Sequence, residues 1–216
     1  VVTAPALDER LQALRPGLAA HVIANGVDAG WFRRQADNLP RPADIPAAGT
    51  PVVGFVGALA HWLDWPLIEQ VVAAVPDAHF VFVGPGDNEG RLASLRALPN
   101  ATVLGWRPYE QVPAYVQAFT ACWVPFAQSA VGRSANPVKV YEYLSLGKPV
   151  VTTPVADADG FGGVVPVARD ADEMVARLQA ALAAPLEGAD ARRAYADRNT
   201  WAARAEAYRK FAESLR

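Results

Sequence analysis

One stretch of sequence decides the fold: Asn136-Pro137-Val138-Lys139-Val140-Tyr141-Glu142-Tyr143-Leu144-Ser145-Leu146-Gly147-Lys148-Pro149-Val150-Val151. It predicts a helix with both ends marked, because Asn136 can cap the first turn, Pro137 suits the first helical position and Gly147 can end the helix in a left-handed conformation. Pro149 stops the helix, and the β-branched run after it predicts a buried strand. A helix that starts at the edge of a parallel sheet offers its N–H groups to anions. We therefore expect this helix start to hold the phosphates and the ribose of a nucleotide.

The composition indicates a folded globular chain. Hydrophobic residues make up 52% of the 216 residues and charged residues 19%, too apolar a mixture for a disordered protein. The 20 basic and 22 acidic residues give a net charge of −2, which carries no nucleic-acid signature. We expect no nucleic-acid partner.

The chain has one cysteine, Cys122, so it can form neither an internal disulfide nor a cysteine metal cage. No apolar run approaches the roughly 20 residues of a membrane span, and no signal peptide opens the chain. We therefore expect a cytoplasmic protein. The first residue is Val1 and the one methionine is Met174, from which we expect a fragment or a processed product.

Outward from the opening stretch, strand and helix patterns alternate. The expected strands cover residues 51–59, 78–83, 101–105, 120–126, 150–153 and 164–167. The expected helices cover residues 64–75, 89–98, 109–119, 136–146, 170–184, 188–196 and 199–215. Before them we expect a helix within 1–18, a short strand at 21–24 and a loop or short helix in 30–50. This alternation predicts an α/β fold, a Rossmann-like three-layer domain with a parallel sheet that ends in helices.

Ligands of such sheets bind at the carboxyl ends of the strands. The loops that follow the expected strands cover residues 57–63, 84–88, 105–109, 127–137 and 153–163. The candidate ligand-binding residues in the first three loops are Gly57, Ala58, His61, Gly84, Gly86, Trp106 and Arg107. Each also fits a plainer role, namely a tight turn, an exposed histidine or a packed tryptophan.

The fourth loop leads into the opening helix. Arg133 and Lys139 can reach phosphate oxygens presented to the N–H groups of Val138 and Lys139. Glu142 follows Lys139 at i+3 on the same helix face. Two roles fit it, a surface ion pair with Lys139 and a carboxylate that accepts both ribose hydroxyls.

Metal binding has one weak candidate, Asp157-Ala158-Asp159 in the fifth loop. A plain turn explains this sequence better than a metal site. We therefore expect no metal and no cofactor.

Five segments together resemble a known family: VIANGVDAGWF (22–32), GFVGAL (54–59), HFVFVGPG (79–86), VLGWRPYEQVPAYVQAFTACWVPF (103–126) and NPVKVYEYLSLGKPVVTT (136–153). Their order and spacing resemble the carboxy-terminal half of group 1 glycosyltransferases, the family 4-like enzymes of the GT-B fold. The resemblance covers roughly residues 20–170, and the last segment is the most specific.

The resemblance implies a nucleotide-sugar donor domain. It implies that Glu142 binds the ribose hydroxyls, that the helix start at Asn136, Pro137, Val138 and Lys139 meets the diphosphate, and that residues near Arg107 line the base pocket. We expect catalytic roles for Arg133, Lys139 and Glu142. The resemblance also implies three parts: an amino-terminal helix and linker at 1–20, the nucleotide-sugar domain at 21–198, and a helix at 199–216 that packs back towards an acceptor domain outside this chain.

Two positions depart from the family pattern. Ser134 stands where the family usually has a glutamate that faces the donor sugar, and residues 58–65 lack the family's arginine and lysine. The phosphate charge must then fall on His61, Arg133, Lys139 or the helix dipole. The pattern resembles a sub-branch with an NPxKxYEYL signature tied to cell-envelope or exopolysaccharide assembly.

The implied activity is transfer of a hexose-type sugar from a nucleoside-diphosphate sugar to an acceptor. The acceptor, a sugar or a lipid-linked saccharide, would bind the absent amino-terminal domain, and the full-length protein could touch a membrane peripherally. We expect this chain alone to bind donor and turn over little of it. The alternatives are a GT-B sugar epimerase, a degenerate nucleotide-sugar-binding module and an unrelated Rossmann-like nucleotide domain.

Overall fold

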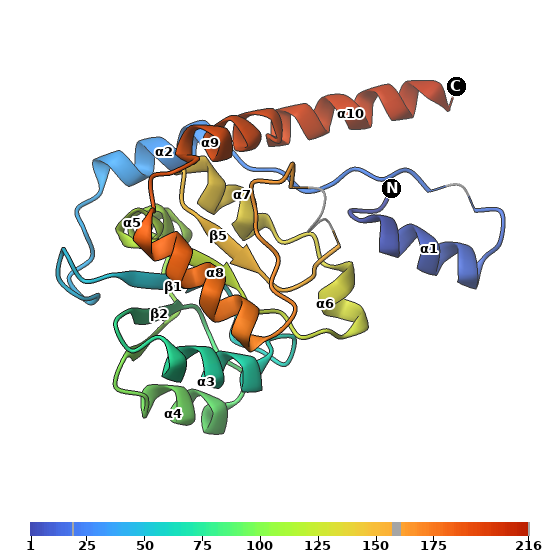
Figure 1. Cartoon of the computed structure of the whole chain (residues 1–216). Coiled ribbons are helices and arrows are strands. Elements are labelled where there is room, and N and C mark those ends of the chain that lie inside the picture. Colours follow the sequence, from blue (N-terminus) through green and yellow to red (C-terminus); the bar gives the residue numbers. More distant parts are fainter. Residues whose placement is uncertain (19, 157–160, 216) are drawn as a thin grey trace.

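A five-stranded parallel sheet lies at the centre of the protein (Figure 1). The computed structural model describes residues 1–18, 20–156 and 161–215. The strands are β1 (Val52–Val56), β2 (His79–Val83), β3 (Ala101–Gly105), β4 (Ala121–Val124) and β5 (Val150–Thr152). Their order across the sheet is β3-β2-β1-β4-β5. The predicted α/β parallel sheet is confirmed, and its strand order reverses between β1 and β4.

Helices cover both faces of this sheet (Figure 1). One face carries α3 (Trp65–Ala74), α4 (Glu89–Arg96) and α8 (Ala171–Ala183). The other carries α2 (Ala29–Asn38), α5 (Val112–Ala118) with the short 3₁₀ turn η1 (Tyr109–Gln111), α7 (Val138–Ser145) and α9 (Ala189–Arg198). Strands β1, β2, β4 and β5 read as continuous apolar runs because they are buried on both faces, whereas the edge strand β3 is only partly buried.

Local signals place several helix ends where the sequence predicts them. The Asp64 side chain accepts a hydrogen bond from the Leu67 N–H at 3.1 Å and so caps α3. Gly147 has a φ of 72°, and the N–H of Lys148 donates to the Tyr143 carbonyl at 3.1 Å. This left-handed glycine ends α7 as predicted.

Two predicted strands are wrong. Residues 21–24 make a single bridge between Val22 and Val2, and residues 164–167 make a single bridge between Val167 and Thr152. Pro166 contributes only its carbonyl to Thr152, at 3.1 Å, because proline has no N–H for a ladder. Each segment therefore pairs at one point and does not extend into a strand.

Two further segments contain helices: residues 30–50, for which a loop or a short helix is predicted, and the loop before α7. Part of 30–50 is α2, whose first turn is capped by Asp28 through a 2.9 Å hydrogen bond from Trp31. The loop before α7 contains α6 (Ala130–Ser134), capped by the hydroxyl of Ser129. Asp28 and Ser129 are both short polar residues of the kind that cap helices, but the loop-like composition of the two segments hides this signal.

The terminal helices stand apart from the core. Neither α1 (Pro5–Leu14) nor α10 (Trp201–Ser214) has a buried residue. Figure 1 shows α10 running along one side of the molecule, past the segment that leads from α1 to α2. His21 and Phe211 stack at 4.5 Å between ring centroids and connect the two ends of the chain. Within the described ranges, no helix has both the length and the apolar character to cross a membrane. The division at residues 20 and 198 stays a prediction.

Candidate functional site

The loops after β1 and β2 meet at the carboxyl end of the sheet. Gly57 and Gly84 have φ values of 144° and 146°. The Gly57 N–H donates to the Val83 carbonyl at 2.8 Å, and a Cβ on Gly84 would lie 2.1 Å from the Gly57 carbonyl oxygen. Both φ values favour glycine, and at Gly84 the facing backbone also lies too close for a side chain.

The Lys139 side chain occupies the space beside Gly57. Its Nζ lies 4.5 Å from the centroid of the Phe55 ring and 4.9 Å from that of Phe126, and 2.6 Å from the position a Cβ on Gly57 would take. Burial lowers its pKa from 10.5 to about 8, and nearby Glu142 opposes part of that shift. A cation attracted to two aromatic faces therefore stands where the strand order reverses, which is where ligands of such sheets bind.

Glu142 is buried one turn further along α7. Its Oε1 accepts a hydrogen bond from the hydroxyl of Tyr109 at 2.7 Å. Burial raises the pKa of Glu142, while the Tyr109 hydroxyl and Lys139 act to lower it. The structure thus gives this carboxylate a tyrosine partner, and its position is not that of a solvated surface acid.

The predicted cap at Asn136 is wrong. The residue that precedes α7 is Pro137, and no side chain caps the helix there. Asn136 is buried, and its Oδ1 accepts from the Asn25 N–H at 2.8 Å, while the Asn25 amide donates to the Asn136 carbonyl at 2.7 Å. Asn136 therefore fixes the start of α7 to the loop before α2. Val138 is the first helical residue, so its N–H and that of Lys139 belong to the turn that offers N–H groups to anions.

The remaining candidates in the loops after β1 and β2 are Ala58, Gly86 and His61, and they lie in different surroundings. Ala58 is partly exposed beside Gly57. Gly86 bridges to Leu59 and packs against Leu92. The His61 side chain is 74% exposed, and its Nδ1 lies 3.8 Å from a carboxylate oxygen of Asp87. His61 thus lies on the surface at the rim of the two loops.

The candidate arginines are held by other partners. Arg107 makes an ion pair with Asp44 at 2.8 Å and donates to the Tyr115 hydroxyl at 3.0 Å. Arg133 is exposed and donates to the Gln128 carbonyl in its own loop at 2.6 Å. Trp106 is 65% exposed, and Ser134 is the partly buried last residue of α6. The structure therefore joins Gly57, Gly84 and Lys139 directly and leaves the two arginines in other contacts.

The sequence alone did not single out two aromatic residues of this site. The Tyr109 ring stacks on Trp31 with centroids 5.3 Å apart and planes 4° apart. Tyr109 follows β3 in one of the strand-end loops, which is the signal that could have found it. Trp31 comes from α2, 78 positions earlier in the chain, and no local pattern links it to Glu142.

Among residues 1–18, 20–156 and 161–215, no group of three or more His, Cys, Asp or Glu residues could hold a metal ion. Asp157 and Asp159 lie outside the described residues.

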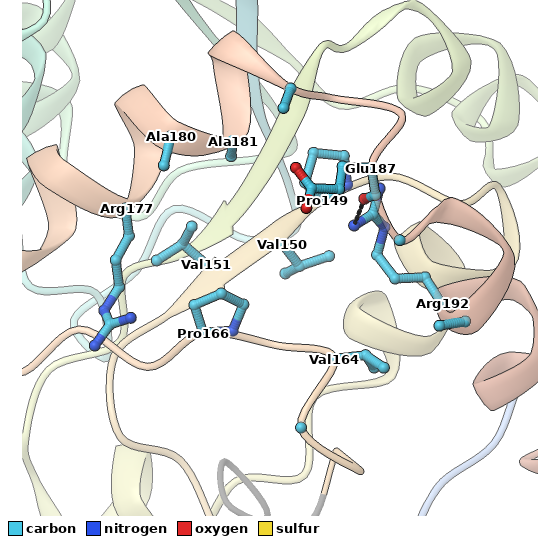
Figure 2. Close-up of a pocket in the computed structure, with 14 residues that line it drawn as sticks. Pro149, Val150, Val151, Val164, Pro166, Arg177, Ala180, Ala181, Glu187 and Arg192 are labelled. Carbon is cyan, nitrogen blue, oxygen red and sulfur yellow. Dashed lines mark hydrogen bonds between the residues drawn. The ribbon is translucent and has the colours of Figure 1, made fainter.

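A separate cavity of about 450 Å³ lies beside the edge strand β5 (Figure 2). Figure 2 shows Arg177 at one end of it and Arg192 with Glu187 at the other. Arg192 is buried and donates to the carbonyls of Gly147, Glu187 and Pro185 at 2.8, 2.7 and 2.8 Å. It thereby fixes the end of α7, the helix that carries Lys139 and Glu142.

The chain matches the family model of group 1 glycosyl transferases over residues 50–184, more than half of its length. It is 31% identical to the putative teichuronic acid biosynthesis glycosyltransferase TuaH of Bacillus subtilis, over 68% of this chain and 37% of that protein. It is 30% identical to the 2-deoxystreptamine glucosyltransferase of Streptomyces kanamyceticus, over 67% of this chain and 38% of that protein. The chain therefore spans less than two fifths of the length of these relatives.

The fold is shared with solved GT-B glycosyltransferases. HepE of Anabaena, solved in complex with UDP, has a TM-score of 0.76 at 17% identity, over 99% of this chain and 62% of that one. A structure of the same protein with UDP and glucose has a TM-score of 0.71. On the family match and the identity to TuaH, this chain belongs to the group 1 glycosyltransferases.

Proposed function

We propose that this chain is the donor-binding part of a glycosyltransferase that moves a hexose-type sugar from a nucleoside-diphosphate sugar to an acceptor. The observation that carries the proposal is the position of Lys139 above Gly57, at the reversal of strand order and in the first turn of α7. A diphosphate at this place would meet one ammonium group and the N–H groups of a helix start.

The proposed mechanism follows from where charge develops. Breaking the bond to the sugar leaves negative charge on the departing diphosphate, and the sugar passes through an oxocarbenium-like state. Lys139 and the N–H groups at the start of α7 would stabilise that charge as it forms. We propose that no metal and no cofactor take part. The side chain of Arg133 would have to leave the Gln128 carbonyl to help, so we assign the larger share to Lys139.

Glu142 would accept the ribose hydroxyls from its place one turn beyond Lys139. Burying a carboxylate costs free energy that hydrogen bonds and nearby charges only partly offset, and such groups are common at binding sites. Its raised pKa and its position beside the proposed phosphate site support this role. HepE was solved with UDP and with UDP and glucose, and this likeness supports a nucleotide ligand for the present chain.

We further propose a role in cell-envelope or exopolysaccharide assembly. The name of the TuaH relative, with its teichuronic acid biosynthesis, supports this part of the proposal. The acceptor would bind residues outside this chain.

The first test is a thermal-shift screen against UDP, GDP, ADP, dTDP and their sugars, followed by calorimetry with the best ligand. We expect one nucleoside diphosphate to raise the melting temperature, since a ligand that binds only the folded state stabilises it. If none of the panel binds, the proposed function is wrong.

One alternative rests on specific observations. Ser134 replaces a glutamate that is usual in the family. His61 lies beside Asp87 and Arg133 bonds to the Gln128 carbonyl, so neither side chain joins Lys139 at the proposed phosphate site. A degenerate module that binds donor without turnover fits these features. Transfer assays on a full-length parent would separate the two: donor binding with no transfer to any acceptor would favour the module.

A further inference from the structure

The contact between Tyr109 and Glu142 joins two distant parts of the site. Tyr109 lies in η1 after β3, and Glu142 lies in α7, yet their oxygens are 2.7 Å apart. The Tyr109 ring is held from behind by Trp31, and the Phe32 ring lies 6.5 Å away between centroids. Three elements therefore combine to place one hydroxyl on one carboxylate oxygen.

This arrangement is not explained by stability alone. Glu142 is only 7% exposed, while Tyr109 is 51% exposed. A buried carboxylate with one hydrogen bond from a half-exposed hydroxyl costs more free energy than an apolar side chain of similar size. Burying this carboxylate is therefore a cost that the binding of a ligand would offset.

We infer that Tyr109 is a positioning residue for the nucleotide: its hydroxyl holds Oε1 of Glu142 and so directs Oε2 towards the ribose hydroxyls. This inference rests on the proposed nucleotide-binding function. The carboxylate rotates about its last bond when it has no fixed neighbour, and a tyrosine fixed by stacking removes that freedom. Tyr109 also favours the ionised form of Glu142, the form that accepts two hydroxyl donors.

The charged groups around the pair are few in the described structure. Lys139 faces Glu142 from the same helix, and Asp28, the cap of α2, acts on the Tyr109 hydroxyl. Lys139 and Tyr109 lower the pKa of Glu142 against the effect of burial. Loss of the Tyr109 hydroxyl therefore raises that pKa.

The test compares Tyr109→Phe with the wild-type chain in calorimetry. Phenylalanine keeps the stack on Trp31 and removes only the hydroxyl. The probes are the best-binding nucleoside diphosphate of the panel, UDP first, and its 2′,3′-dideoxy analogue. The wild-type chain is expected to prefer the ribonucleotide by roughly tenfold, the scale of a hydrogen bond to a charged group. Tyr109→Phe should lose most of that preference and keep the affinity for the dideoxy analogue.

A second readout is the pH profile of ribonucleotide binding. Its acid limit should move to higher pH in Tyr109→Phe, because Glu142 is then protonated more readily. Tyr115→Phe is the matched control: its hydroxyl bonds to Asp44 at 2.9 Å and not to Glu142. It should keep both the ribose preference and the acid limit.

Several outcomes would overturn the inference. An unchanged ribose preference in Tyr109→Phe would show that the hydroxyl positions nothing. Tighter ribonucleotide binding would show that the hydroxyl competes with the ribose. Equal loss for both probes would assign Tyr109 to base stacking or folding. A wild-type chain that binds no probe would instead defeat the proposed function itself.

Discussion

Lys139 and Gly57 share one space: a Cβ on Gly57 would lie 2.6 Å from the Lys139 ammonium and 2.9 Å from its Cε. The lysine reaches this place from the first turn of α7, across the reversal of strand order between β1 and β4. The absence of a side chain at Gly57 is what lets the cation approach the ends of the strands. This relationship governs the first two predictions.

Gly57→Ala should displace Lys139 and weaken nucleoside-diphosphate binding by about tenfold, because the new methyl group enters the space of the ammonium and the φ of 144° disfavours any side chain. Calorimetry of the purified variant measures the effect. Gly49→Ala is the matched control: it has a φ of 100° with nothing within 4 Å. It should bind as the wild-type chain does, and equal affinity in both variants would contradict the role of this contact.

Lys139→Met should weaken binding of the diphosphate and yet raise the free energy of unfolding at pH 7. The pKa of Lys139 is lowered from 10.5 to about 8, so the folded chain loses this proton as the pH rises through about 8, while the unfolded chain keeps it up to about 10.5. The free energy of unfolding of the wild-type chain therefore rises as the pH increases between those two values. Methionine removes the buried charge at every pH.

Diphosphate binding by the wild-type chain should also fall as the pH rises above about 8, since the neutral lysine no longer attracts the anion. Calorimetry from pH 6 to 9.5 measures diphosphate binding. Urea unfolding at both ends of that range measures the change in stability. A pH profile that Lys139→Met leaves unchanged would count against the lysine as the phosphate ligand.

Glu142→Gln should abolish the preference for ribose over 2′,3′-dideoxyribose and leave stability at pH 7 equal or higher. Burial raises the pKa of Glu142 above 4.5, so this group stabilises the fold most below the unfolded value, and that contribution is lost as the pH rises through the folded value. Glutamine keeps the shape without the charge. Glu110, which is exposed and follows Tyr109 in the sequence, provides the control, since Glu110→Gln should change neither property. Retained ribose preference in Glu142→Gln would remove Glu142 from the site.

Arg192→Lys should lower the free energy of unfolding by about 2 kcal/mol or more, since lysine cannot donate to three carbonyls from a buried position. Urea denaturation measures the change. Arg193→Lys is the control, because Arg193 makes one ion pair, with an Asp190 side chain that is fully exposed. The affinity of the folded Arg192→Lys chain for nucleotide should stay close to that of the wild-type chain. If its stability is unchanged, Arg192 does not hold the end of α7.

Local sequence was a good guide wherever a residue acts on its immediate neighbours. Asp64 caps α3 and Gly147 ends α7 as predicted, because both effects depend on a few adjacent backbone groups. Asn136 was a poor guide because its contact is not with its immediate neighbours. Its side chain can cap a helix, but a distant partner, Asn25, takes its oxygen. Pairing across 111 positions has no local signature.

The sequence by itself determined the alternation of strands and helices, the glycines at the strand ends and the family to which the chain belongs. The first two depend on apolar periodicity and on backbone conformations that only particular residues adopt, and the family follows from the resemblance of five sequence segments. The tertiary structure alone decided which side chains meet: Lys139 with Gly57, Tyr109 with Glu142, and Arg107 and Arg133 with other partners. The reason is that side-chain contacts between elements depend on the packing of α2, η1 and α7 at the end of the sheet, and spacing along the chain does not specify that packing.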